Sequence, residues 1–205
     1  MNKATQTKII KRVLKTAETR KSPKDFLTTR ICNDKQYCTD GYRVFIFKSV
    51  VTDVPYITLE EGEIPLEIRL LENLNQEYDF KVHLKRPSLS HLKEHLKTVR
   101  ARNKVSYERF HKTAFYSFGE KFPLVNERFL IDILEVMPRS SLYCHATANG
   151  EDLSRDNVYA MDTETNCCML LPIVVVGAIP KDLINHYVDE GQEALQPKRR
   201  RMGGA

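Results

Sequence analysis

The sequence has little of what marks membrane, secreted or nucleotide-binding proteins. Its 205 residues contain no apolar run long enough to span a bilayer, and the basic start of the chain lacks the apolar core of a signal peptide. Eight glycines are little material for a phosphate-cradling loop, and neither a glycine-rich nucleotide motif nor a GxSxG nucleophile motif occurs. Five cysteines, an odd number at scattered spacing, do not make a disulfide framework. We therefore expect a globular, cytoplasmic protein of one domain, with no membrane partner.

Charge is distributed unevenly along the chain. Residues 1–48 and 80–121 are strongly basic, whereas residues 49–79 and 122–180 are acidic, within a formal net charge of +5. Such blocks indicate either faces of opposite potential or blocks that pair with one another in the fold. Basic blocks of this size attract phosphates by releasing counterions. A nucleic-acid face and a solvated, internally paired surface both remain open at this point.

The stretch 122–176 is typical of one helix packed on a small sheet. Asn126 suits a helix N-cap, and Pro138 ends the helix because it has no N–H to donate. Between them the apolar side chains recur at helical spacing, at Phe129, Leu130, Ile133, Leu134 and Met137. Residues 141–146, 156–162 and 169–176 are predicted to be strands.

A similar succession of elements opens the chain. Residues 7–20 carry an apolar stripe at helical spacing, with most of the basic residues off that stripe. Strands are predicted at 25–33, 36–39 and 42–50, the last two joined by a type I′ turn at Asp40-Gly41. We assign Asp40, Gly41 and Arg43 to turn geometry and a surface charge.

The middle of the chain differs in character from both ends. Residues 51–79 are acidic and include a short amphipathic helix at 64–74, and this acidic segment is expected either to cover a basic face or to dock a partner. A strand at 80–84, a helix at 88–101 and an extended aromatic-rich segment at 105–118 follow.

The order of parts resembles a domain of the DNA sliding clamp family, the bacterial polymerase processivity factor. The resemblance lies in the helix pattern NxxFLxDxLxxxP at 126–138, in the terminal strand ending LLPI, and in the upstream TDG within YCTDGYRVF. It implies an α+β, DNA-clamp-like domain over residues 1–180, without a catalytic site or cofactor. Two helix-plus-antiparallel-strand halves, 1–50 and 106–180, would stand in a pseudo-twofold arrangement. A central insertion at 51–105 would carry an extra helix, and 181–205 would be a helical turn with a disordered basic tail.

In the clamp family, function comes from geometry, because a ring of six such domains encloses duplex DNA with its helices lining the hole. The resemblance therefore implies DNA, replication proteins and a homo-oligomer as partners. Basic side chains on the first and second long helices are the candidate DNA contacts: Lys8, Lys11, Arg12, Lys15, Arg20, Lys93, Lys97, Arg100, Arg102 and Lys104.

One departure from the family concerns the helix at 126–137. Its polar positions carry Glu127, Asp132 and Glu135 against the single Arg128, and an acidic helix that faces phosphates repels them. We therefore expect a small DNA-associated accessory protein, linked to replication or to a phage or mobile element, rather than a clamp that encircles DNA.

Two alternatives belong to other functional classes. His91, Glu94 and His95 form the HxxEH pattern of zinc-dependent hydrolases, for which Asp162 or Glu164 would supply the third ligand. The surrounding lysines oppose the binding of a dication.

The cysteines are a separate candidate site. Cys32 and Cys38, and Cys144-His145 beside Cys167-Cys168, are interpreted as core residues, with zinc binding as the rarer outcome. A protein-interaction module that binds no nucleic acid is the second alternative.

Overall fold

The computed structural model describes residues 2–60, 63, 81–102, 113–145, 152–162, 166–173 and 179–186. It confirms the predicted α+β class, with helices and an antiparallel-rich sheet packed in layers. In chain order the described elements are α1 (Lys3–Thr19), the 3₁₀ turn η1 (Lys24–Phe26), β1 (Thr29–Cys32), β2 (Lys35–Thr39), β3 (Arg43–Phe47), β4 (Tyr56–Thr58), β5 (Lys81–Leu84), α3 (Leu89–Arg102), β6 (Phe115–Ser117), β7 (Leu124–Asn126), α4 (Glu127–Val136), β8 (Ser141–His145), β9 (Val158–Met161), β10 (Cys167–Leu170), the 3₁₀ turn η4 (Lys181–Leu183) and β11 (Ile184–His186).

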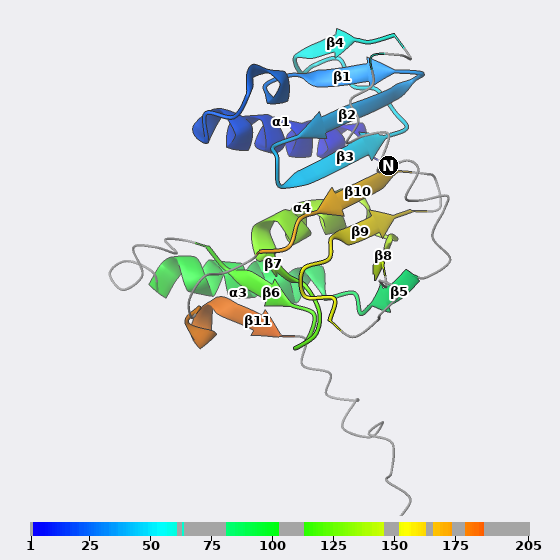
Figure 1. Cartoon of the computed structure of the whole chain (residues 1–205). Helices are drawn as coiled ribbons and strands as arrows, with labels where there is room; N and C mark the ends of the chain where they lie inside the picture. Colours follow the sequence, from blue (N-terminus) through cyan, green and yellow to red (C-terminus); the bar gives the residue numbers. More distant parts are fainter. Residues whose placement is uncertain are drawn as a thin grey trace, which may run out of the picture.

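The described strands form an eight-stranded sheet in the order β4-β1-β2-β3-β10-β9-β8-β5 and a three-stranded sheet in the order β11-β6-β7 (Figure 1). All neighbours in the larger sheet are antiparallel except β1 and β4. Helix α1 is followed by the meander β1-β2-β3, and α4 is followed by β8-β9-β10. The two meanders meet at the antiparallel pair β3·β10, where Arg43 lies opposite Leu170.

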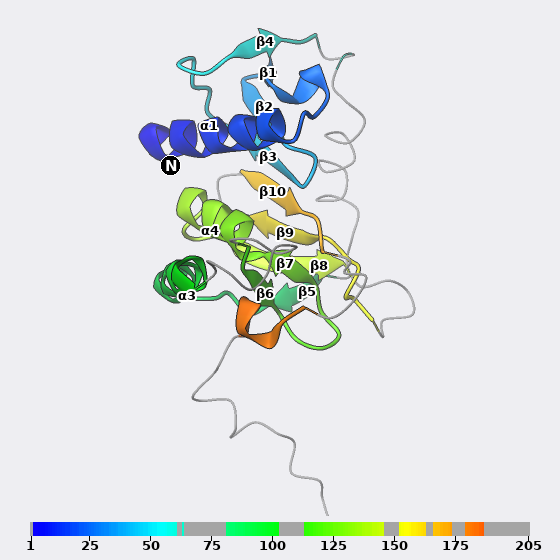
Figure 2. The same ribbon diagram turned by 90° about the vertical axis from the view of Figure 1, so that its left-hand side faces the viewer.

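The three long helices pack on one side of the large sheet, with α4 between α1 and α3 (Figure 2). The apolar stripe of α1 is buried in the core, as its spacing predicts, from Ile9 to Ala17. Phe45 and Phe47 of β3 point into this core, whereas Val44 and Ile46 belong to a second cluster on the opposite face. Strand β3 is therefore buried on both faces, at the centre of the molecule.

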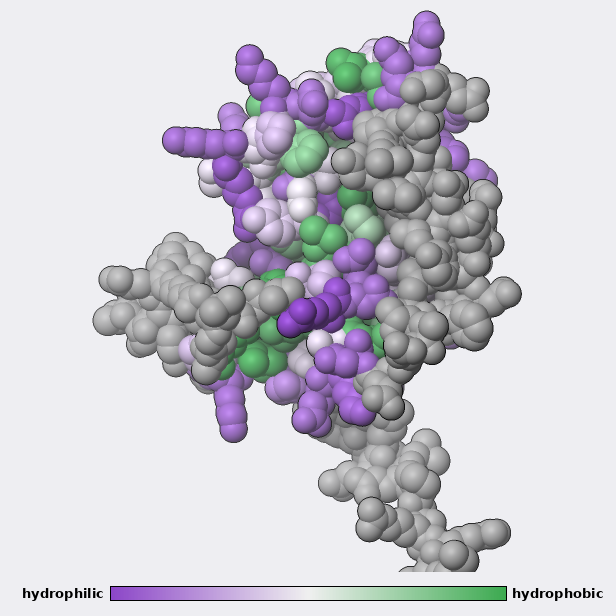
Figure 3. All heavy atoms as spheres, viewed as in Figure 1, coloured by the Kyte–Doolittle hydropathy of each residue, from purple (hydrophilic) through white to green (hydrophobic). Residues whose placement is uncertain are grey.

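The second cluster lies on the sheet face turned away from the helices. Tyr143 and Tyr159 stack there with ring centroids 5.6 Å apart, and Tyr37 belongs to the same cluster. On the side that Figure 3 shows, most of the coloured surface is hydrophilic and the hydrophobic areas are small and separate. Among the described helices, none has the length and apolarity needed to cross a membrane.

Most predicted elements are present, with shifted ends. The helices predicted at 7–20, 88–101 and 126–137 correspond to α1, α3 and α4. The last predicted strand ends early, because after β10 the N–H of Leu171 donates to Tyr42 and that of Ile173 donates to Leu124. Residues 181–183 form the expected turn, but β11 follows it and was not predicted. The predicted helix at 64–74, most of the segment 105–118 and the basic tail lie outside the described residues.

The type I′ turn is predicted at the wrong place. Asn33 and Asp34, between β1 and β2, have φ values of 48° and 58°, as that turn requires. At the predicted position only Gly41 has a positive φ, of 83°. Asp40 instead accepts hydrogen bonds from the backbone N–H of Tyr42 and Arg43, both 3.1 Å, through Oδ1. A buried side-chain cap therefore closes this connection.

The proposed cysteine pairs do not form. Cys32 and Cys38 lie on opposite faces of the sheet, because they belong to different core clusters. Strand β9 separates Cys144 on β8 from Cys167 and Cys168 on β10. All five thiols are buried, in agreement with the interpretation of these residues as core.

Candidate nucleic-acid interface

A buried ion network joins α1, β3 and α4 beneath the helix layer. Arg43 donates from Nη1 to Oδ2 of Asp132 at 2.5 Å and from Nε to Oδ2 of Asp40 at 3.0 Å. The other oxygen of Asp132 accepts from Arg12 at 2.5 Å. The side chains of Arg43, Asp40 and Asp132 are completely buried. The assignment of Arg43 to the surface was therefore wrong, because two carboxylates compensate its burial. Burial lowers the pKa of Arg43, but Asp40 and Asp132 outweigh it and raise that pKa overall.

The other two acids of α4 are also engaged within the molecule. Glu135 binds Lys93 at 2.6 Å and Arg12 at 3.2 Å, and its pKa is lowered because these cations outweigh the effect of burial. Glu127 is buried and accepts from Asn185 at 2.7 Å, with His95 also at 2.7 Å. The expectation that α4 presents an acidic face is thus wrong. Its carboxylates point to partners on α1, α3, β3 and β11.

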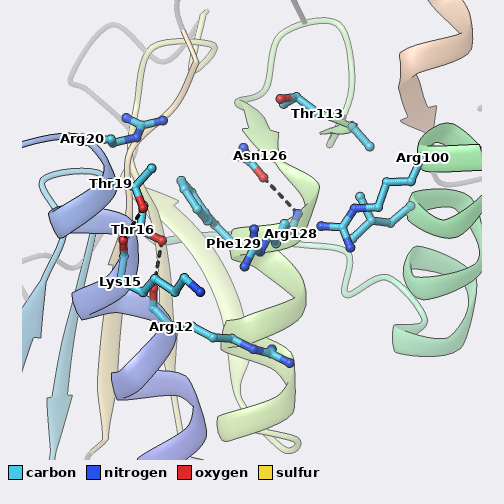
Figure 4. A pocket seen from close by; sticks show the side chains of 12 residues that line it. Arg12, Lys15, Thr16, Thr19, Arg20, Arg100, Thr113, Asn126, Arg128 and Phe129 are labelled. Carbon is cyan, nitrogen blue, oxygen red and sulfur yellow. Dashed lines mark hydrogen bonds between the residues drawn. The ribbon is translucent and has the colours of Figure 1, made fainter. Parts of the chain in front are cut away.

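With the acids engaged, the helix layer carries a basic cleft of about 660 Å³ (Figure 4). Helix α1 forms one wall, α3 the other, and the first turn of α4 lies between them. The Asn126 side chain fixes that first turn by accepting from the N–H of Arg128 at 3.0 Å. The lining residues are Arg12, Lys15, Thr16, Thr19, Arg20, Leu96, Arg100, Thr113, Ala114, Asn126, Arg128 and Phe129.

Four cations of this cleft, Lys15, Arg20, Arg100 and Arg128, are exposed, and no described carboxylate lies within 4 Å of them. Figure 4 shows Arg100 extending from α3 toward α4, where Arg128 also lies in the cleft. Burial lowers the pKa of Arg128, and the charges of Arg100, Arg43 and Arg12 lower it further against the opposing effect of Asp132. A guanidinium nonetheless stays charged, so the positive charges of Arg128 and Arg100 repel one another in the cleft. A bound anion would reduce this repulsion.

A second cleft of about 430 Å³ continues the basic surface along α3 and α4. It shares Arg12, Leu96, Arg100 and Arg128 with the first cleft. Lys93 and Lys97 of α3 enter it, together with Ile131, Asp132 and Glu135. The two clefts therefore form one basic surface across the helix layer, with Arg128 and Arg100 in both parts.

The structure brings together six of the ten predicted contacts. Arg12, Lys15, Arg20, Lys93, Lys97 and Arg100 line one or both clefts. Lys8 and Lys11 are exposed on α1 but line neither, and Lys11 lies 3.7 Å from Asp53. Arg102 is the last residue of α3 and its side chain is not described, and Lys104 lies outside the described residues.

Sequence reasoning missed Arg128, which lies at the centre of the surface. Its charge was weighed only against the acids of the same helix. The sequence did contain a signal for this residue. Arg128 stands two positions after the Asn126 cap, and this spacing places it in the first turn of the helix.

The residues of the HxxEH pattern have other partners. His91 Nε2 is 3.2 Å from Asn185 Oδ1, and His95 Nδ1 is bonded to buried Glu127, whose pKa burial raises. Glu94 is exposed, and Asp162 accepts from Asn166. In the part of the chain that the structure describes, no three His, Cys, Asp or Glu residues are grouped to hold a metal ion. Glu164 lies outside that part.

Searches of protein-family models, of curated proteins and of solved structures each return no match. The function must therefore be argued from the chemistry of the site.

Proposed function

We propose that this protein is a non-enzymatic, DNA-associated accessory protein with a sliding-clamp-like fold, linked to replication. The observation that carries the proposal is the basic surface of the helix layer, where Lys15, Arg20, Arg100 and Arg128 have no carboxylate partner among the described residues. A phosphate backbone supplies the regularly spaced anions that such a surface lacks.

The topology supports the clamp-like part of the proposal. Each meander follows one helix, α1 or α4, and the third strands of the two meanders pair antiparallel at the centre of the sheet. In a clamp-like domain a pseudo-twofold axis near the β3·β10 pair would relate the two halves, and α1 and α4 do lie side by side on the same face of the sheet. Helix α3 extends this face and provides the second wall of the cleft. A clamp-like domain presents its helices to DNA in this way.

Binding should be strongly salt-dependent if the cleft holds phosphates. Each neutralised phosphate contributes about −0.9 to the slope of log K against log salt for duplex DNA. Four contacts at Lys15, Arg20, Arg100 and Arg128 therefore predict a slope of about −3 to −4.

The test is a charge reversal at two cleft positions, Lys15→Glu with Arg100→Glu. Both side chains are exposed, so the fold should tolerate the change. The matched control is Lys48→Glu with Lys121→Glu, which alters the net charge equally at exposed positions outside both clefts. Affinity for a labelled duplex, measured by fluorescence anisotropy over a salt series, should fall at least about tenfold only in the cleft variant. Equal losses in both variants, or binding that salt does not weaken, would contradict the proposal.

The replication partners and the homo-oligomer are part of the same proposal. The two end strands of the described large sheet, β4 and β5, are the edges at which copies of a clamp-like domain would meet. Light scattering with and without DNA measures the mass of the assembly. A monomer under both conditions would leave DNA binding in place and remove the homo-oligomer.

A further inference from the structure

A ladder of alternating cations and aromatic rings leads from the buried ion network to the basic cleft. The Arg43 guanidinium carbon lies 4.2 Å from the centroid of the Phe129 ring. Phe129 and Tyr42 follow with centroids 6.3 Å apart and ring planes at 41°. The Arg20 guanidinium carbon then lies 3.8 Å from the centroid of Tyr42. Phe129 and Arg20 both line the cleft, and in Figure 4 the Phe129 ring points from α4 toward the Arg20 end of α1.

The two members of the ladder nearest the surface, Tyr42 and Arg20, are held in place by hydrogen bonds of their own backbone groups. The N–H of Tyr42 donates to Asp40, and its carbonyl accepts from the N–H of Leu171 at 2.9 Å. Arg20 caps the C-terminus of α1, with its N–H donating to Thr16 at 3.1 Å. The residue Tyr42 is nevertheless 44% exposed, so the stack lies at the surface. Such a stack orders a long side chain at the edge of the cleft before any ligand arrives.

We propose that Arg20, supported by Tyr42, is a base-stacking site at this end of the cleft, so that the protein prefers single-stranded DNA to duplex. The inference rests on the proposed function and adds the nucleic-acid class to it. A planar guanidinium stacked on one ring has a second face, and nucleobases stack on such faces. Bases of a duplex are already stacked on one another, whereas those of a single strand are available. The neighbouring Lys15, Arg100 and Arg128 would hold the phosphates of the same strand.

The experiment compares three labelled ligands of equal length: oligo(dT), an abasic oligonucleotide and a duplex. Arg20→Lys keeps the positive charge and removes the planar stacking face. Tyr42→Ala removes the supporting ring. Tyr56→Ala is the matched control, because Tyr56 is 45% exposed but lies on β4 and lines neither cleft. Thermal melting of each variant checks that the fold is retained.

The wild-type protein should bind oligo(dT) at least about fivefold more tightly than the abasic strand, the effect of stacking one base. Arg20→Lys and Tyr42→Ala should each lower oligo(dT) affinity by a similar factor without changing abasic binding, while Tyr56→Ala changes neither. Equal binding of oligo(dT) and abasic strands, both salt-dependent, would overturn this inference and leave the proposed function intact. Absence of salt-dependent binding to every ligand would overturn both.

A direct reporter keeps the test decisive if Tyr42→Ala does not fold. The sequence contains no tryptophan, so Tyr42→Trp introduces a single indole that preserves the stack. Its emission should be quenched by oligo(dT) and unaffected by the abasic strand. Equal quenching by both strands would show that no base stacks at this position.

Discussion

The sharpest test of the fold is removal of the carboxylate that joins its halves, by Asp132→Ala. The Asp132 side chain is completely buried and binds Arg43 through one oxygen and Arg12 through the other. Arg43 is equally buried and, among the described residues, retains only Asp40 as a carboxylate partner after the substitution. Its Nη2 atom already lacks a hydrogen-bond partner among the described residues, so Nη1 becomes a second uncompensated donor group. Arg12 is 32% exposed and can still reach Glu135, so most of the cost falls on Arg43.

The expected loss is about 3–5 kcal/mol in the free energy of unfolding, the usual cost of breaking a buried pair from one side. A domain stability of about 5–15 kcal/mol would thereby lose about a fifth or more of its value. With a urea m-value of about 3 kcal/mol/M, the unfolding midpoint should drop by about 1 M or more. Asp132→Asn keeps the volume and loses the charge, and it should show a large part of the same loss.

Urea denaturation followed by far-ultraviolet circular dichroism measures these values. The control is Asp53→Ala, because Asp53 makes an exposed ion pair with Lys11 at 3.7 Å. Such a pair contributes about 0–1 kcal/mol, so the control should remain close to wild type. If Asp132→Ala costs no more than Asp53→Ala, the buried network does not hold the two halves together.

Two further predictions concern pH and thiol chemistry. Burial raises the pKa of Glu135, but Lys93, Arg12 and Lys8 lower it by more, so the folded-state pKa is below the ordinary value of 4.5. The ionised Glu135 side chain therefore stabilises the fold fully above pH 4.5, and this stabilisation is lost as the pH falls through the folded-state pKa. Glu135→Gln should therefore unfold about 1 kcal/mol more easily at pH 7, and this deficit should shrink as the pH falls below 4.5 through the lowered folded-state pKa of Glu135. A deficit that does not shrink with falling pH would refute this account. Burial raises the pKa of Cys144 to about 11 and raises that of Cys38 and Cys168 as well, so Ellman's reagent should leave the native thiols unmodified and titrate all five after unfolding. Rapid modification of the native protein would show that the sheet opens far more readily than its burial implies.

The elements that sequence reasoning predicted best are those whose cause is local. The stripe from Ile9 to Ala17 and the Asn126 cap each depend on residues within a few positions, and both appear as expected. Strands set by long-range pairing were missed or misplaced. Strand β11 exists because Ile184 to His186 pairs in parallel with β6, some seventy residues earlier in the chain, and three residues carry no period that reveals this.

The turn at Asp40 shows how a local rule fails when a tertiary partner intervenes. Asp-Gly between two strands favours a type I′ turn in isolation. Here the Asp40 side chain caps the following N–H groups with one oxygen and binds buried Arg43 with the other. Arg43 in turn needs Asp132, eighty-nine positions away. No window around the turn contains that information.

The same limit explains why the charge of α4 was misread, and it decides what the cleft can bind. The acids of that helix were counted as exposed because their partners lie on other elements: Arg12 and Arg43 for Asp132, Lys93 for Glu135, and Asn185 for Glu127. Surface potential depends on the charge left after such pairing. What remains in the first cleft is Lys15, Arg20, Arg100 and Arg128. The carboxylates of α4 bind Arg12, Arg43 and Lys93 within the molecule, so they do not neutralise these remaining cations of the cleft. Those cations are therefore available to an anionic ligand.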